Sequence, residues 1–251
     1  MSDERLDAAV PASEPADDLA SDLADEELED EATFEMRVFV VGHLQTMCYA
    51  VISNQLRADG KRPCLVVDPG ASGAAIAERL DDVAVELVVA THGHADHVSG
   101  VAQLCAATGA PFAMAAPDVE RACHARQWTS HHAPETTDAP APDRLLAEGD
   151  EVSVGALRFR VIAVPGHTPG GIVLAGVEGS EAEGIAFVGD TLFAGSVGRT
   201  DLAGGDQAQL MASLARLVRE LPDETILCCG HGDTTTMAHE KATNPYLRGL
   251  S

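Results

Sequence analysis

The chain has 251 residues, 45% of them hydrophobic, and its 40 acidic residues against 16 lysines and arginines give a formal charge of −24. This length and apolar content allow one substantial core. The negative surface repels phosphate backbones and anionic lipids, so we expect neither a nucleic-acid partner nor a membrane partner. No stretch approaches the roughly 18 consecutive apolar residues of a membrane-spanning helix.

The N-terminal segment differs from the rest of the chain in composition. Residues 1–31 contain thirteen acidic residues, one base and no aromatic residue. Such a segment buries too little apolar surface to offset its ordering entropy. We therefore expect a disordered acidic tail over residues 1–32 and one folded domain over residues 33–251. The segment lacks the basic and apolar regions of a secretory signal, and the six cysteines show no CxxC, so we expect a cytoplasmic protein with reduced thiols.

Short strands dominate the predicted elements that follow. Apolar, β-rich runs predict strands at 37–41, 47–52, 64–67, 85–90, 161–164, 185–188 and 225–229. The run at 85–90 is apolar throughout, as expected for a strand that is buried on both faces. Strands of this kind alternate with predicted helices, which indicates the α/β class.

Two helices and one irregular region complete the predicted order. A helix is expected over residues 72–80, with Ser72 as its N-cap. A second helix opens at Asp206, and leucines recur at helical spacing from residue 210 to residue 221. Residues 118–146 contain runs of proline, alanine and aspartate, and we expect an irregular insertion or loop there.

The strongest chemical signal directly follows the predicted strand at 85–90. The sequence there is Thr91-His92-Gly93-His94-Ala95-Asp96-His97. His92 and His94 leave the strand end on the same side, so both can face one metal ion. Asp96 and His97 fall on the next turn of the backbone and can face a second ion. Imidazole and carboxylate ligands together suit Zn, Fe or Mn.

Three more candidate ligands stand in the same context. His167, Asp190 and His231 each follow an apolar run and lie beside glycine. Loops at the carboxyl edge of an α/β sheet are where functional sites assemble, and glycine there permits close approach of the backbone. Five histidines and two aspartates delivered to one edge predict a site for two metal ions.

These residues resemble the signature of the metallo-β-lactamase superfamily, and in particular of its glyoxalase II (hydroxyacylglutathione hydrolase) branch, over about residues 37–250. The resemblance implies an αββα four-layer sandwich, with residues 33–251 forming a hydrolase domain and the site at one edge of two packed sheets. It implies two divalent metal ions, zinc in the first place, with iron or manganese as alternatives. The implied ligands are His92, His94 and His167 for one ion, Asp96, His97 and His231 for the other, and Asp190 between the two.

The same resemblance implies a mechanism. A water that bridges two cations would be hydroxide at neutral pH. Asp96 and Asp190 would then be catalytic as well as ligating residues. The implied activity is hydrolysis of a small-molecule thioester, such as a hydroxyacyl-glutathione or a similar thiol ester, through the metal-bridging hydroxide. A lactone hydrolase on the same fold is an alternative.

The motifs from Asp190 onward help to distinguish between branches of the superfamily. Asp190-Thr191-Leu192-Phe193 and Gly198-Arg199-Thr200-Asp201-Leu202 look like the short glyoxalase II-like hydrolases, and they also occur in persulfide dioxygenases, which keep one iron. Persulfide dioxygenases usually read Ala-His-Asp-Tyr at the last motif, whereas this chain has Gly230-His231-Gly232-Asp233. That difference favours the hydrolase over the mononuclear iron dioxygenase.

Two features leave the substrate open. Only twenty residues follow His231, so the chain resembles a short form without the helical C-terminal domain that contacts glutathione in long glyoxalase II enzymes. Arg199 and Asp201 lie shortly after Asp190. They could bind a substrate carboxylate, or they could support the site as an ion pair behind the ligands.

Overall fold

The computed structural model describes residues 34–128 and 135–250. The predicted acidic tail, residues 1–32, lies outside the described residues, so the boundary between tail and domain stays a prediction. Within the described residues, no helix has the length and apolar character that crossing a membrane requires.

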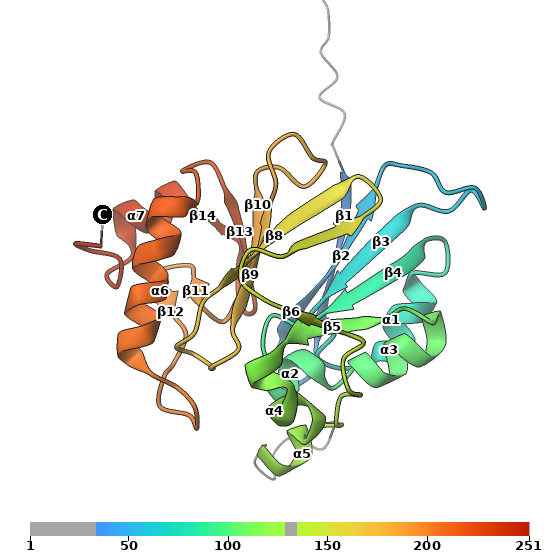
Figure 1. The fold of residues 1–251 in the computed structure, drawn as a ribbon, viewed down its shortest axis with the longest axis horizontal. Helices are drawn as coiled ribbons and strands as arrows, with labels where there is room; N and C mark the ends of the chain where they lie inside the picture. Colours follow the sequence, from blue (N-terminus) through green and yellow to red (C-terminus); the bar gives the residue numbers. More distant parts are fainter. Residues whose placement is uncertain (1–33, 129–134, 251) are drawn as a thin grey trace, which may run out of the picture. The chain divides into compact units, whose positions relative to one another are not determined.

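The first sheet combines an N-terminal hairpin with a parallel half (Figure 1). Its six strands run in chain order: β1 (Phe34–Val41), β2 (Thr46–Ser53), β3 (Pro63–Val67), β4 (Ala84–Val89), β5 (Phe112–Ala115) and β6 (Arg144–Leu146). β1, β2 and β3 pair antiparallel, and β3 to β6 pair parallel. The parallel half therefore brings the carboxyl ends of several strands to one edge.

The second sheet is mostly antiparallel, with the order β14-β13-β10-β9-β8-β7. Its strands are β7 (Glu151–Val154), β8 (Leu157–Ala163), β9 (Ile172–Gly176), β10 (Ile185–Gly189), β13 (Ile226–Cys229) and β14 (Thr235–Thr236). β10 and β13 pair parallel. A separate two-stranded ribbon joins β11 (Leu192–Phe193) to β12 (Ser196–Val197).

Helices cover the outer face of each sheet (Figure 1). The helical elements near the first sheet are α1 (Gly73–Arg79), α2 (Ala95–Val98), α3 (Val101–Thr108), the 3-10 turn η1 (Ala116–Asp118), α4 (Val119–Cys123) and α5 (Ala125–Trp128). Two helices belong to the second sheet, α6 (Gln207–Glu220) and α7 (Met237–Thr243). Three separate clusters of buried apolar residues fill the spaces between these layers.

Successive side chains of a strand point to opposite faces of the sheet, and this alternation explains the layers. On β2, Tyr49 and Val51 enter the cluster between the sheets, while Ala50 and Ile52 join the cluster under α1 and α3. On β10, Phe187 points between the sheets and the residues beside it join the cluster under α6. Strands that are apolar on both faces need cover on both faces. The fold is therefore the predicted α/β, αββα four-layer sandwich.

Most predicted elements match the structure to within a few residues. The seven predicted strands correspond to β1, β2, β3, β4, β8, β10 and β13. The helix predicted to open at Asp206 is α6, and the Asp206 carboxylate caps it by accepting a hydrogen bond from the Gln209 backbone N–H at 3.0 Å. The leucines of this helix, including Leu210 and Leu214, are buried under the second sheet.

One local prediction was confirmed in part, and another was wrong. Ser72 is the N-cap residue of α1, as predicted, but its backbone is left-handed (φ 55°) and its side chain makes no capping hydrogen bond. Residues 118–146 are more regular than predicted, because the described part of this region forms α4, α5 and the edge strand β6. Pairing of β6 with β5 stabilises a strand that local propensity does not reveal.

The packing between the sheets gives a testable expectation. Phe159 on β8 is fully buried, and its ring centroid lies 5.7 Å from that of Phe187. Replacing Phe159→Ala removes this contact and leaves a cavity, so we expect the free energy of unfolding to fall by about 3–5 kcal/mol in urea titrations. The control Leu56→Ala alters a side chain that is 66% exposed and should stay within about 0.5 kcal/mol. Equal effects of the two substitutions would contradict the layer assignment.

Candidate metal centre

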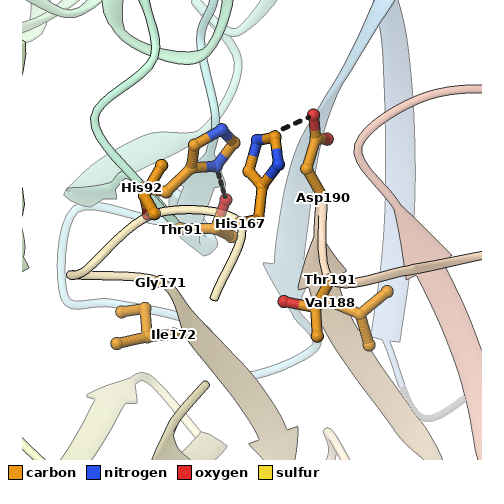
Figure 2. A pocket seen from close by; sticks show the side chains of 9 residues that line it. Thr91, His92, His167, Gly171, Ile172, Val188, Asp190 and Thr191 are labelled. Carbon is orange, nitrogen blue, oxygen red and sulfur yellow. Dashed lines mark hydrogen bonds and ion pairs between the residues drawn. The ribbon is translucent and has the colours of Figure 1, made fainter. Parts of the chain in front are cut away.

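Backbone hydrogen bonds hold the loops with the candidate ligands together at one edge of the sandwich. The Thr91 carbonyl after β4 accepts from the Ile172 N–H at 2.9 Å, which joins the two sheets. The Gly230 N–H donates to the Gly189 carbonyl at 2.8 Å, and the Gly230 carbonyl accepts from the Met47 N–H at 2.8 Å. The strand ends of both sheets therefore meet at this edge. Figure 2 shows His92 and His167 side by side, with Asp190 next to His167.

One group of side chains consists of imidazoles only. His94 Nδ1 lies 3.0 Å from His92 Nε2 and 2.9 Å from His167 Nε2. The possible ligand atoms of these three residues all lie within 4.8 Å of one another. We call His92, His94 and His167 the histidine triad. His92 and His94 come from the loop after β4, and His167 comes from the loop between β8 and β9.

A second group adds a carboxylate. Asp96 and His97 stand on the short helix α2, and His231 follows β13. Asp96 Oδ2 lies 3.2 Å from His231 Nε2 and 3.5 Å from His97 Nε2. We call Asp96, His97 and His231 the mixed triad, whose possible ligand atoms also lie within 4.8 Å of one another.

Asp190 contacts members of both triads. Its Oδ1 lies 3.3 Å from His97 Nε2 in the mixed triad. Its Oδ2 lies 3.5 Å from His167 Nε2 in the histidine triad and 3.5 Å from His231 Nε2 in the mixed triad. The structure thus brings all seven predicted ligand side chains together, and Asp190 lies between the two triads.

The donor atoms fit bound cations. In the described part of the chain, His97 Nε2 and Asp190 Oδ1 are buried ligand-type atoms that lie 3.3 Å apart and make no hydrogen bond of normal geometry. Buried polar atoms rarely stay unpaired, because each one loses its hydration without compensation. Imidazole nitrogen and carboxylate oxygen are the donors that Zn, Fe and Mn accept. The cluster of histidines and aspartates therefore fits a binuclear metal site.

Burial keeps the histidine triad neutral. It lowers the pKa of His92 well below its ordinary value, and it lowers the pKa of His94 to about 3 with a further contribution from His167. The pKa of His167 is lowered as well, again chiefly by burial. Neutral imidazoles have free lone pairs at pH 7, as metal coordination requires.

In the mixed triad, neighbouring carboxylates raise the pKa values of the two histidines. Burial alone would lower the pKa of His97, but Asp190, Asp96 and Asp68 together hold it well above its ordinary value. Burial also opposes the shift at His231, where hydrogen bonds with Asp190 and Asp96 raise the pKa to about 9. In the metal-free protein these two imidazoles therefore carry protons at pH 7.

Asp68 is a buried carboxylate behind the mixed triad. It accepts hydrogen bonds from the Thr91 backbone N–H and from the Thr91 hydroxyl, both at 2.7 Å. Its Oδ2 lies 2.9 Å from His97 Nδ1. A carboxylate only accepts, so Nδ1 carries the proton and Nε2 is left for the site. Sequence reasoning missed this residue, although Asp68 directly follows a predicted strand, as the candidate ligands do.

Asp118 ties two of the ligand loops together. Its fully buried carboxylate accepts hydrogen bonds from the Gly93 N–H at 2.8 Å and from the Gly170 N–H at 2.7 Å. A Cβ atom at residue 170 would lie 2.7 Å from the Asp118 backbone nitrogen, so glycine permits this approach. Sequence reasoning missed Asp118 as well, because it lies in the region that was expected to be irregular.

Backbone carbonyls orient two further ligands. His167 Nδ1 donates to the Arg199 carbonyl at 2.7 Å, and His231 Nδ1 donates to the Leu44 carbonyl at 3.1 Å. The Arg199 guanidinium makes two hydrogen bonds with the Asp201 carboxylate, at 2.6 and 2.7 Å. Arg199 thus supports His167 through its backbone, and its side chain forms an ion pair.

The two triads open onto a cavity of about 870 Å³. His94, Asp96, His167, Asp190 and His231 all line it. Much of the remaining wall comes from the β1–β2 turn, from α5, from residues 135–136 and from the segment that runs from β11 to α6. Its volume suits a small-molecule substrate.

Comparison with known proteins places this arrangement in a family. A model of the metallo-β-lactamase superfamily matches residues 17–231. A hydroxyacylglutathione hydrolase of Pseudomonas putida is 38% identical over 200 residues, which cover 77% of this chain and 68% of that protein. The hydroxyacylglutathione hydrolase GloC of Haemophilus influenzae is 31% identical over 204 residues, which cover 77% of this chain and 91% of that protein.

Solved structures share the fold. The B3 metallo-β-lactamase BLEG-1 has a TM-score of 0.74 at 28% identity, covering 86% of this chain and all of that chain. TTHA1623 in a di-iron-bound form has a TM-score of 0.70 at 34% identity, covering 84% of this chain and all of that chain. ETHE1 from Myxococcus xanthus has a TM-score of 0.65 at 28% identity, covering 86% of this chain and 85% of that chain.

The role of Asp118 can be tested by substitution. Asp118→Asn keeps the shape but presents an N–H group to one of two backbone donors, so the ligand loops should separate. We expect affinity for Zn²⁺, measured by chelator competition, to fall about 10–100-fold. The control Asp150→Asn alters a carboxylate that accepts from the Ala147 N–H in a surface turn, and it should leave affinity unchanged. Wild-type affinity in Asp118→Asn would show that the loops hold their positions without this carboxylate.

Protonation of the mixed triad gives a second expectation. Metal binding must displace the protons on His97 and His231, whose pKa values are raised. At pH 7 we therefore expect release of at least two protons on full loading, and affinity should weaken further as the pH falls. Calorimetry in buffers of different ionisation enthalpy measures the number of protons. His231→Ala should release about one proton fewer, and proton-independent binding in the wild type would refute the assignment.

Proposed function

Since the chain belongs to the metallo-β-lactamase superfamily, we propose that it is a binuclear metal-dependent hydrolase that cleaves a small thioester. The observation that carries this proposal is the position of Asp190, whose two oxygens contact the histidine triad and the mixed triad. The substrate class is supported by two relatives named hydroxyacylglutathione hydrolase.

The candidate ligands would form two metal-binding sites. The histidine triad would hold one ion and the mixed triad the other, with Asp190 shared between them. Two divalent ions bound there would make water a nucleophile at neutral pH and would offset the negative charge that develops on the carbonyl oxygen. Zinc, iron and manganese all match the donor set, and a di-iron-bound structural neighbour supports iron as well as zinc.

The chain's own groups supply orientation and charge. Asp68 and the carbonyls of Arg199 and Leu44 hold three ligand imidazoles in place before substrate arrives. Groups that are fixed in advance need little reorganisation during the reaction, which lowers its barrier. Burial would raise the pKa of Asp190, but His97 and His231 hold it well below its ordinary value, so the carboxylate stays ionised and can accept a hydrogen bond from the attacking water.

Thioester cleavage matches these groups for a further reason. A thiol has a pKa of about 8.5, so the leaving group departs as a thiolate without receiving a proton from the protein. Amide hydrolysis would require such a proton donor. The surroundings of Asp190, which favour ionised carboxylates, therefore suit a thioester better than an amide.

Asp190→Asn tests the proposal directly. The amide keeps the size of the side chain but removes the charge between the triads, so metal affinity and positioning of water should both suffer. We expect kcat/KM on S-lactoylglutathione and on S-lactoyl-N-acetylcysteamine to fall at least about 1,000-fold, equivalent to about 4 kcal/mol. Circular dichroism should stay native, because no core strand depends on this carboxylate.

The control for this test is Asp223→Asn, which removes an equal charge from the exposed ion pair with Lys241. It should retain wild-type turnover. Elemental analysis of each reconstituted protein shows how many metal ions are bound. Full thioesterase activity in metal-loaded Asp190→Asn would refute the binuclear mechanism.

The same preparation separates the alternatives. A lactone, a β-lactam and a thiol persulfide complete the substrate panel. Oxygen consumption with the persulfide, together with one iron per chain, would replace the hydrolase by a mononuclear iron dioxygenase. Turnover of the lactone but of no thioester would keep the metal site and change the substrate class.

A further inference from the structure

Exposed apolar side chains gather at the cavity that the triads face. Leu44, Trp128 and Leu202 remain 53%, 49% and 39% exposed, and all three line this cavity. They come from the β1–β2 turn, from α5 and from the segment before α6. Phe193 and Val197 of the β11–β12 ribbon add to the same lining. Exposed large apolar groups that converge on one concave site indicate an apolar ligand.

The charged residues of the lining also favour an apolar ligand. Among its described residues, Arg199 is the single lysine or arginine side chain. Both of its hydrogen bonds to Asp201 hold the guanidinium in an ion pair, and the two side chains are 62% and 68% exposed. The acidic Glu135 also lines the cavity, and its Oε1 lies 2.5 Å from His43 Nδ1.

A second guanidinium lies nearby but is not part of the lining. Arg121 sits over the Trp128 ring, 4.6 Å from the ring centroid, and donates a hydrogen bond to the Ala203 carbonyl. This contact orients the indole. Within the described lining, the one guanidinium is therefore already ion-paired with Asp201, so a substrate carboxylate near it would have to compete with Asp201 for hydrogen bonds.

We propose that this cavity takes thioesters whose thiol carrier is uncharged and apolar, and that Asp201 disfavours anionic carriers by neutralising Arg199. The inference rests on the proposed thioesterase function and names the substrate class of that same site. Glutathione carries two free carboxylates and would meet a lining whose one arginine is already paired. A small neutral carrier would bury its apolar surface against Leu44, Trp128 and Leu202.

Binding can be measured separately from catalysis. Trp128 is the only tryptophan of the chain, so its fluorescence reports occupation of the cavity. The probes are two thioethers that cannot be hydrolysed, S-hexyl-N-acetylcysteamine and S-hexylglutathione, titrated into the metal-loaded full chain. We expect Kd to be at least about tenfold lower for the neutral probe, equivalent to about 1.4 kcal/mol.

Substitution of Asp201 tests the role of charge. Asp201→Asn releases the Arg199 guanidinium, so the preference for the neutral probe, expressed as the ratio of the two Kd values, should shrink about tenfold. Asp223→Asn is the matched control, because it removes the same charge from an exposed ion pair outside the cavity lining. Its Kd ratio should equal that of the wild type.

Substitution of Leu202 tests the apolar wall. Leu202→Ala should raise the Kd of the neutral probe about threefold or more, since less apolar surface is buried. Leu145→Ala, which alters a leucine 56% exposed on β6, is the control and should have no effect.

Each result decides one of the two proposals. Equal or tighter binding of S-hexylglutathione by the wild type would overturn the carrier preference, whatever the enzyme hydrolyses. An unchanged Kd ratio in Asp201→Asn would overturn the role of the ion pair. Failure to hydrolyse any thioester, with the neutral probe still preferred, would overturn the proposed function alone.

Discussion

Two buried carboxylates hold the loops on which the candidate ligands stand, by accepting hydrogen bonds from them. Asp118 joins the loop after β4 to the loop between β8 and β9 through two backbone N–H groups. Asp68 fixes Thr91 and His97 in the same way. Buried carboxylates are stable only when such donors satisfy them, so each one constrains the loops strongly. Without these contacts, the imidazoles would lose their shared orientation.

Close packing at the site explains its glycines as well. A Cβ atom at residue 230 would lie 2.2 Å from Asp190 Oδ1 and 2.7 Å from His97 Cε1. Gly166, just before His167, has a φ of 142°, and a Cβ there would lie 2.3 Å from the Leu210 backbone. The backbone must therefore approach the ligands more closely than any side chain permits. The dense cluster of candidate ligands therefore requires glycine at the positions beside it.

Much of the cavity wall comes from other parts of the molecule than the candidate metal ligands. The same fold is found in a B3 metallo-β-lactamase and in a di-iron protein, so the fold alone does not identify a reaction. The triads come from strand ends and α2, which the core holds rigidly. The cavity walls outside the triads come largely from the β1–β2 turn, α5 and the segment before α6. Side chains on those surface segments can change without disturbing the ligands, but the backbone carbonyls of Leu44 and Arg199 must stay in place, because they orient His231 and His167.

The amino-acid sequence by itself determined the strands that carry the site and the seven side chains that could bind metal. Both signals are local: apolar runs report burial, and His92, His94, Asp96 and His97 lie within six residues. The tertiary structure decided which groups hold those ligands in place. Asp118 and Gly170 are 52 residues apart, and His231 meets a carbonyl 187 residues away. Such contacts depend on how two sheets pack, and no local pattern of residues encodes that packing.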